Sequence, residues 1–131
     1  MPKTAARAGE LWKTQPDDHD FPAALDYLSL VIEPEAAARL VDALRGADTT
    51  HRKAKDLLRA SRLAVLPLGN VHVQADLKKI KRRQPLSPVL LVRGNVLEAD
   101  RPLQIADGYH RICASFYTDE NADIPCRLVT A

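Results

Sequence analysis

The sequence predicts a single domain of the α+β class, and three observations lead to this prediction. The chain has 131 residues, the usual length of one domain and enough to bury a core. Its apolar content of 46% and charged content of 27% are typical of a globular protein. Apolar residues follow a helical period in the first half, whereas the second half alternates strand-like runs with helical stripes.

The first half is expected to be helical after a polar arm. Residues 1–20 show no apolar period, so we expect a poorly ordered arm in which Trp12 docks onto the domain or a partner. Residues 22–32 fit a short helix followed by a strand-like run. Segment 34–46 begins with Pro and ends with Gly, as helices commonly do. A second helix is expected over 49–60, capped by Thr49 or Thr50. These helices form an N-terminal half, 21–62, of one domain spanning 21–131.

The second half, residues 63–131, is expected to form the core of that domain. Pro67 and Gly69 end a first short apolar run, and the run after Pro88 is nearly continuous, as in a buried strand. A polar turn over 95–102 separates this strand from the next. The predicted elements are strands at 62–68, 87–94, 102–106 and 124–129, and helices over 73–83 and from 109 onward.

Charge and targeting signals exclude several classes of function. A net charge of +2 gives no strong field over the whole protein, so a basic binding surface must be local. The chain has no apolar run of the roughly 20 residues needed to span a bilayer, so we expect no membrane association. It also has no apolar signal core at its N-terminus, which predicts a cytoplasmic protein. Cys113 and Cys126 are expected to be buried thiols in a reducing compartment.

The segment IADGYHR, residues 105–111, carries more polar chemistry than a strand-to-helix turn requires. The first amides of a helix lack intrahelical partners, and the helix dipole favours an anion there. Gly108 admits a close ligand, and His110 and Arg111 add donors for phosphate or carboxylate oxygens. Asp107 faces the same space as a base or a metal contact. In the alternative interpretation, Asp107 caps the helix, Gly108 relaxes the turn, and Arg111 pairs with Asp107.

From Leu63 to Val129, about half of the chain, the sequence resembles the ParB/sulfiredoxin-like superfamily. The segments that carry the resemblance are HVQADLKKI, PLSPVLLVRG, DGYHRICAS and IPCRLV, in the order found in sulfiredoxins. The turn is most similar to the D-G-H-H-R turn of free-serine kinases, from which it differs only at Tyr109. The resemblance implies a ParB/sulfiredoxin-like core with additional N-terminal helices, and a nucleotide phosphate site on the turn.

The resemblance also assigns residues to this site. Tyr109 stands where sulfiredoxins have their attacking cysteine, so sulfiredoxin activity is not expected. The phosphate-contacting lysine of that family falls on His72, and its helical serine and threonine fall on Ala75 and Lys79. The expected catalytic residue is Asp107, and the expected phosphate- or nucleotide-binding residues are Gly108, Tyr109, His110, Arg111, His72 and Lys79. The implied cofactor is ATP, ADP or another nucleotide with Mg²⁺, and no metal-ligand cluster of the chain itself is expected.

Three hypotheses about function follow. The first is a protein that binds a nucleotide or a phosphorylated small molecule; its catalytic form is a small-molecule phosphotransferase, and the sequence leaves open whether it is an enzyme. The second is a non-catalytic, partition-like or regulatory module that binds nucleic acid through the cations of segment 78–83. Those cations also fit a solvated helix end; they are Lys78, Lys79, Lys81, Arg82 and Arg83. The third is a scaffold in which the 107–111 turn is only structural.

Overall fold

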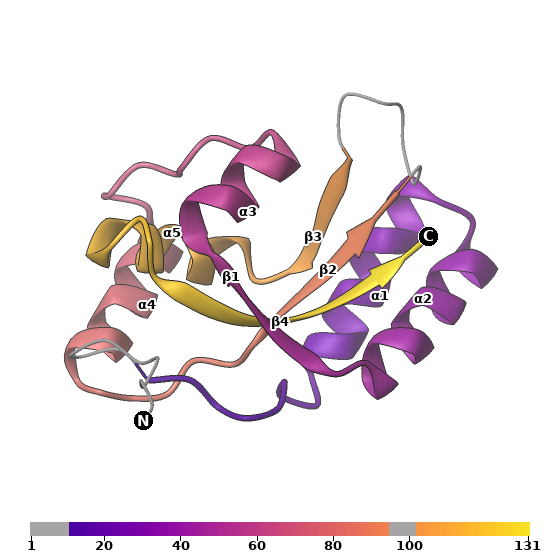
Figure 1. Ribbon diagram of the computed structural model, residues 1–131, viewed down its shortest axis with the longest axis horizontal. Helices are drawn as coiled ribbons and strands as arrows, with labels where there is room; N and C mark the ends of the chain where they lie inside the picture. Colours follow the sequence, from indigo (N-terminus) through magenta and orange to yellow (C-terminus); the bar gives the residue numbers. More distant parts are fainter. Residues whose placement is uncertain (1–10, 95–101) are drawn as a thin grey trace.

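The computed structural model describes residues 11–94 and 102–131, which fold as an α+β domain (Figure 1). The first ten residues of the expected arm, and nearly all of the expected turn over 95–102, lie outside the described residues. The elements in chain order are α1 Asp20–Val31, α2 Pro34–Gly46, β1 Thr49–Lys53, α3 Ala54–Ser61, α4 Val71–Lys81, β2 Val89–Arg93, β3 Leu103–Asp107, α5 Tyr109–Thr118 and β4 Asp123–Thr130.

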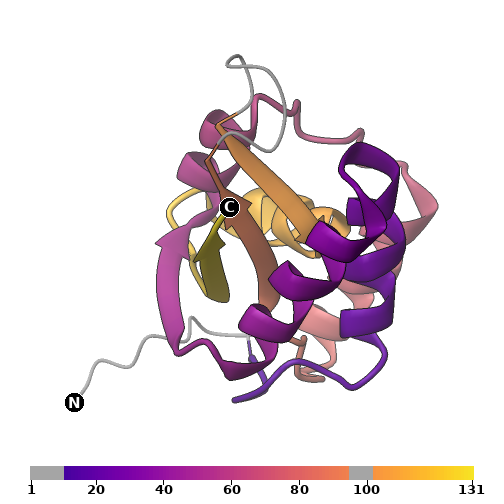
Figure 2. The same ribbon diagram turned by 90° about the vertical axis from the view of Figure 1, so that its right-hand side faces the viewer.

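The strands form one mixed sheet in the order β1-β4-β2-β3. Strands β2 and β4 are parallel, and the other neighbouring pairs are antiparallel. Helices α1 and α2 lie against one face of the sheet, while α3 and α5 cover the other and α4 packs beside α5 (Figures 1 and 2). The domain therefore has three layers, and both faces of the sheet are covered.

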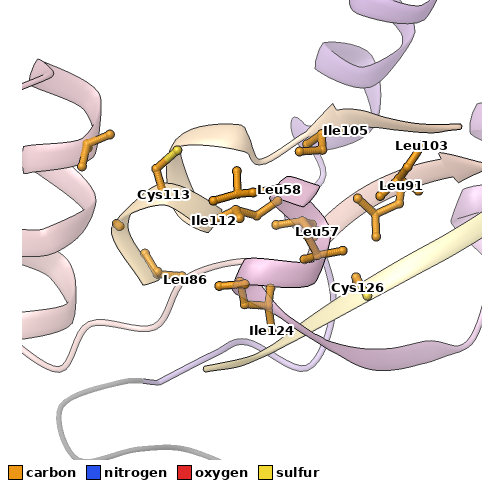
Figure 3. Close-up of a cluster of buried hydrophobic side chains, with 14 of the residues drawn as sticks. Leu57, Leu58, Leu86, Leu91, Leu103, Ile105, Ile112, Cys113, Ile124 and Cys126 are labelled. Carbon is orange, nitrogen blue, oxygen red and sulfur yellow. The ribbon is translucent and has the colours of Figure 1, made fainter. Parts of the chain in front are cut away.

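Each face of the sheet carries its own hydrophobic core. Val89 and Leu91 of β2 belong to the cluster under α3, α4 and α5, part of which is drawn in Figure 3. Leu90 and Val92 point the opposite way, into the cluster under α1 and α2. All four are fully buried. This two-sided burial explains why β2 was predicted from a continuous apolar run rather than from an alternating one.

Two predictions for the N-terminal half are wrong. Segment 49–60 is not one helix: residues Thr49–Lys53 form β1, an edge strand that pairs with β4, and α3 begins only at Ala54. Because the side chains of β1 are almost all exposed, the strand shows no apolar alternation, and only pairing with β4 specifies it. The expected strand-like run at the end of 22–32 is also absent, since α1 continues to Val31.

The predicted strand at 62–68 is wrong as well. Among the described residues it has no partner strand, and Pro67 supplies no amide for one. Hydrogen bonds from α5 hold it instead. Tyr109 Oη donates to the Ala64 carbonyl at 2.5 Å, and Tyr117 Oη donates to the Leu66 carbonyl at 2.6 Å. The apolar run therefore packs as an irregular segment beside the helix.

The described end of the N-terminal arm is attached to the domain. Trp12 forms an isolated β-bridge with Leu86 and packs against the core under α3, α4 and α5. The Lys13 amide donates to the Leu86 carbonyl at 2.8 Å, and the Leu86 amide donates to the Leu11 carbonyl at 3.1 Å. Among the described residues, no helix has the length and apolar character needed to cross a membrane.

Truncation of a core residue should separate packing from surface effects. Leu90 is fully buried under α1 and α2, whereas Leu30 on α1 is 84% exposed. We expect Leu90→Ala to lower the free energy of unfolding by about 2–5 kcal/mol, because it leaves a cavity. Leu30→Ala, the control, should change it by less than about 0.5 kcal/mol. Urea denaturation monitored by circular dichroism measures both, and equal losses would contradict the core assignment.

Candidate functional site

A cleft of about 270 Å³ lies between α4 and the turn that joins β3 to α5; we call it the α4–α5 cleft. Six of the seven predicted site residues line it: His72 and Lys79 from α4, and Asp107, Gly108, His110 and Arg111 from the turn. Ala75 and Asp76 complete the lining. The structure thus brings together residues from two segments that are well separated in the sequence.

Tyr109, the seventh predicted residue, does not line this cleft. Its ring packs against the core, and its hydroxyl group donates a hydrogen bond to the Ala64 carbonyl. Tyr109 instead lines a neighbouring cavity of about 440 Å³, and Tyr27 of α1 lines the same cavity. Three residues of the turn, Asp107, Gly108 and His110, line both spaces. The turn therefore forms the boundary between two adjoining cavities.

Arg111 is already neutralised by carboxylates of the protein. Its Nη2 atom lies 2.9 Å from Asp107 Oδ2 and 3.9 Å from Asp20 Oδ2, and it donates to the Pro88 carbonyl at 3.3 Å. The protein itself therefore supplies the charge that compensates a cation in the first turn of α5, and no bound anion is needed for that purpose. The alternative interpretation, in which Arg111 pairs with Asp107, describes this contact correctly. Arg111 Nε is buried and has no hydrogen-bond partner among the described residues.

Asp20 supports this ion pair and was missed by the sequence analysis. It is only 2% exposed at the start of α1. Its Oδ2 atom accepts hydrogen bonds from Ser87 Oγ at 2.6 Å and from the Asp17 amide at 3.1 Å. No local pattern reveals a carboxylate whose partners come from distant segments. In the sequence analysis, Asp20 was the last residue of the expected polar arm.

Gly108 is required by packing. Its φ of +113° lies in the left-handed region. A Cβ atom at this position would lie 2.4 Å from Val89 Cγ1 and 2.8 Å from Val89 Cβ. The turn therefore passes so close to β2 that only glycine fits, whether or not a ligand approaches from the other side.

Burial raises the pKa of both carboxyl groups that line the cleft. It raises the pKa of Asp107, where the nearby Asp20 acts in the same direction and the Arg111 guanidinium opposes it. Burial also raises the pKa of Asp76, against the attraction of Lys79. Asp76 was missed by the sequence analysis, although its position four residues after His72 and three before Lys79 places all three on one helix face.

The two imidazoles of the cleft interact. The ring centroids of His72 and His110 lie 4.8 Å apart. Burial lowers the pKa of His110 below its ordinary value, and His72 and Arg111 lower it further, while Asp76 opposes the shift. His110 therefore favours the neutral imidazole, which has one donor and one acceptor nitrogen.

The two helix starts beside the cleft differ. Asn70 caps α4, where its Oδ1 atom accepts from the amides of His72 and Val73 at 2.9 and 3.1 Å. The cap position of α5 is Gly108, which has no side chain to offer. The positive end of the α5 dipole therefore faces the site without a side-chain cap.

The five cations of segment 78–83 are all exposed. Of these five described residues, only Lys79 lines the cleft. Lys78, Lys79 and Lys81 occupy the last turn of α4, where cations interact favourably with the helix dipole. Their position fits both a solvated helix end and a basic surface.

One group among the described residues has the spacing of a metal site. Asp17, His19 and Asp20 each offer a ligand atom, and these atoms lie within 4.8 Å of one another. However, Asp17 pairs with Lys13 at 2.7 Å, and the Arg111 guanidinium lies 3.9 Å from Asp20. These cations already neutralise the carboxylates and disfavour a further positive ion.

No protein-family model, curated protein or solved structure matches this chain. The α+β class is established by the structure itself. The resemblance to ParB/sulfiredoxin-like proteins stays a prediction, and so do the ligands that it implies.

Substitution of Gly108 should test the close approach of the turn to β2. We expect Gly108→Ala to lower the free energy of unfolding by about 2–4 kcal/mol, because it adds a steric overlap with Val89 to an unfavourable backbone conformation. Gly69→Ala is the matched control, since a Cβ there meets nothing within 4 Å. Thermal and urea unfolding compare the two variants. A Gly108→Ala protein as stable as the wild type would contradict the packing requirement.

His110 should make stability depend on pH. Its pKa is lowered in the folded state, so the unfolded chain binds a proton more readily. Between that lowered pKa and about 6.5, stability should therefore fall as pH falls. Asp76 and Asp107, with raised pKa values, act in the opposite direction at lower pH.

The difference between wild type and His110→Asn isolates this contribution. The free energy of unfolding is measured in urea from pH 7.5 downward, and we expect a shallower loss near pH 6 in the variant. His51→Asn, on the exposed strand β1, is the control and should keep the slope of the wild type. Identical slopes for wild type and His110→Asn would show that burial does not disfavour the protonated imidazole.

Proposed function

We propose that the α4–α5 cleft binds the phosphate group of a nucleotide or of another phosphorylated small molecule. The observation that carries this proposal is the convergence of Lys79, His72 and His110 around the first turn of α5, which has no side-chain cap. An ammonium group, two imidazoles and helix amides are all donors to phosphate oxygens.

The side-chain donors of α4, His72 and Lys79, are expected to make most of the contacts with the phosphate. Arg111 is engaged with Asp107 and Asp20, whereas Lys79 is exposed and forms no ion pair with a described residue. A phosphate beside His110 favours its protonated form, because the anion offsets the repulsion from the Arg111 guanidinium that lowers the pKa of this imidazole. Phosphate binding at this cleft is therefore coupled to proton uptake.

The carboxylates give the cleft a second capability. Asp107 is held in place by Arg111, and its raised pKa suits a group that accepts a proton from a hydroxyl. Asp76 and Asp107 also offer the oxygen ligands that Mg²⁺ prefers, so a magnesium–nucleotide complex fits the lining. These features support phosphoryl transfer to a small hydroxyl compound as the catalytic form of the proposal.

The adjoining cavity provides space for the rest of such a ligand. It shares Asp107 and His110 with the cleft and is bordered by two aromatic rings, Tyr27 and Tyr109. Tyr27 Oη donates to Gln104 Oε1, which fixes the orientation of its ring. A nucleoside or another flat group fits an aromatic lining of this kind better than a free phosphate does.

A ligand panel tests this function. Thermal shifts are measured with ATP, ADP, CTP, GTP and inorganic phosphate, each with and without Mg²⁺. A ligand at about a hundred times its dissociation constant should stabilise the fold by about 2.7 kcal/mol. Lys79→Gln and His72→Gln should abolish the shift. Lys78→Gln is the matched control, since Lys78 is the exposed neighbour outside the cleft and should leave the shift unchanged.

Two outcomes would contradict the proposal. One is the absence of a shift with every member of the panel. The other is an equal loss in Lys78→Gln and Lys79→Gln, which would place the ligand on the general basic surface of α4. Oligonucleotide binding that falls steeply with salt and depends on Lys78, Lys81 and Arg82 would favour the nucleic-acid hypothesis instead.

A further inference from the structure

Strand β1 lies at one edge of the sheet, and among the described strands it pairs only with β4 (Figure 2). The last pair of this register sets Lys53 opposite Asp123. One residue further along, the Ala54 amide donates a hydrogen bond to the Ala122 carbonyl at 3.0 Å. Because bonded and non-bonded pairs alternate in an antiparallel ladder, this bond fixes the direction in which each peptide group of β1 points.

The residues of β1 that are bonded to β4 are Thr50 and Arg52. The residues that turn their N–H and C=O groups outward, away from β4, are Thr49, His51 and Lys53. The position of Pro125 agrees with this assignment, since it stands opposite His51 and has no N–H group to donate. The outer edge of β1 therefore offers a row of donors and acceptors to a further strand.

The edge is open to such a strand. Residues 50–53 are exposed, and the pairing of β1 with β4 runs through Thr49–Lys53 without a bulge. The strand TTHRK contains no proline, and proline is a common means of protecting an edge from further pairing. Charged side chains are another such means, so the charges around β1 decide which partner fits.

Those charges do not favour a strongly acidic peptide. Asp123 stands opposite Lys53 at one end of the strand, and Asp48 immediately precedes it at the other end. Carboxylates of the chain therefore already lie near both ends of the edge. A partner strand that carries both a cation and a carboxylate matches this pattern better, and β1 of a second copy is such a strand.

Two copies of β1 fit each other in an antiparallel register about a two-fold axis at His51. This register overlaps all five residues and sets outward-facing residues opposite outward-facing residues. Arg52 then lies opposite Thr50 of the second copy, and Lys53 lies opposite Thr49 of the second copy. Arg52 is also diagonal to Asp48 of the second copy, a separation that a long side chain can bridge. The two-fold axis repeats this ion pair, so the contact is self-complementary.

We propose that two copies of the chain associate through β1. The outward peptide groups of Thr49, His51 and Lys53 would form the main-chain hydrogen bonds, and the two sheets would become one continuous sheet. Because strands of five residues bury less area than a standard interface, we expect the dimer to dissociate on dilution. The proposal is independent of the function proposed for the α4–α5 cleft, since none of the described residues 48–53 lines that cleft.

Amide hydrogen exchange of the full chain tests the alternation of the peptide groups. NMR follows the exchange of the β1 amides in dilute and in concentrated solution, and sedimentation velocity reports the mass in each. We expect the amides of Thr49, His51 and Lys53 to exchange more slowly in concentrated solution. The amides of Thr50 and Arg52, which are bonded to β4 in either state, should change little.

Variants of two residues test the contacts. His51→Pro removes an outward donor but no hydrogen bond to β4, so the chain should stay folded by circular dichroism and become monomeric. His51→Thr keeps the amide and is the control, which should still dimerise. Arg52→Glu should raise the dissociation constant of the dimer about tenfold, because two ion pairs become repulsive. Asp48→Arg in the same chain should restore the affinity, because the ion pair is then reversed.

Two outcomes would overturn the proposal. A wild-type chain that stays monomeric in concentrated solution would leave the edge of β1 to a strand of another protein. A dimer that persists in both His51→Pro and Arg52→Glu would show that the copies associate through another surface.

Discussion

The ion pair that Arg111 makes with Asp107 and Asp20 ties together the parts of the fold that meet at the site. It joins α5, the end of β3, the start of α1 and, through the Pro88 carbonyl, the entry to β2. Charges taken out of water are tolerated only when they are paired and hydrogen-bonded. Loss of one partner would leave the others as unpaired buried charges and would lower the free energy of unfolding. Ser87 and the Asp17 amide complete the hydrogen bonding of Asp20. The two helical layers are thereby fixed relative to each other at the turn.

This constraint decides which groups of the α4–α5 cleft remain available. Arg111 forms ion pairs with carboxylates of the protein, and Gly108 packs against Val89. The 107–111 turn therefore has a structural role. The donors left for a ligand come mostly from α4 and from His110. The sequence analysis assigned most of the phosphate donors to the turn. In the structure, the donors that are not engaged within the protein lie mainly on α4, the helix that faces the turn. A motif with strong chemical character can therefore serve the packing of the fold, with its polar groups paired inside the protein.

Elements with local signals were predicted correctly, and elements that depend on distant partners were not. The helix over 34–46 and the buried strand after Pro88 follow from caps and apolar pattern alone. Strand β1 has no such pattern, since it exists only through pairing with β4. The same distinction applies to the cleft. His72 and Lys79 were named from the resemblance, and Asp76 lies on the same helix face, whereas Asp20 meets Arg111 only in the folded chain. No period or motif encodes such a contact.

Carboxylates of the protein itself balance the positive charge of the α4–α5 cleft. In the α4–α5 cleft, Asp76 and Asp107 already oppose Lys79 and Arg111, so an incoming anion competes with internal carboxylates. Burial raises the pKa of both carboxyl groups, and the cations beside them, Arg111 at Asp107 and Lys79 at Asp76, oppose that shift. An anion bound in the cleft would favour the neutral forms of Asp76 and Asp107 and the protonated form of His110, so its affinity is expected to depend on pH.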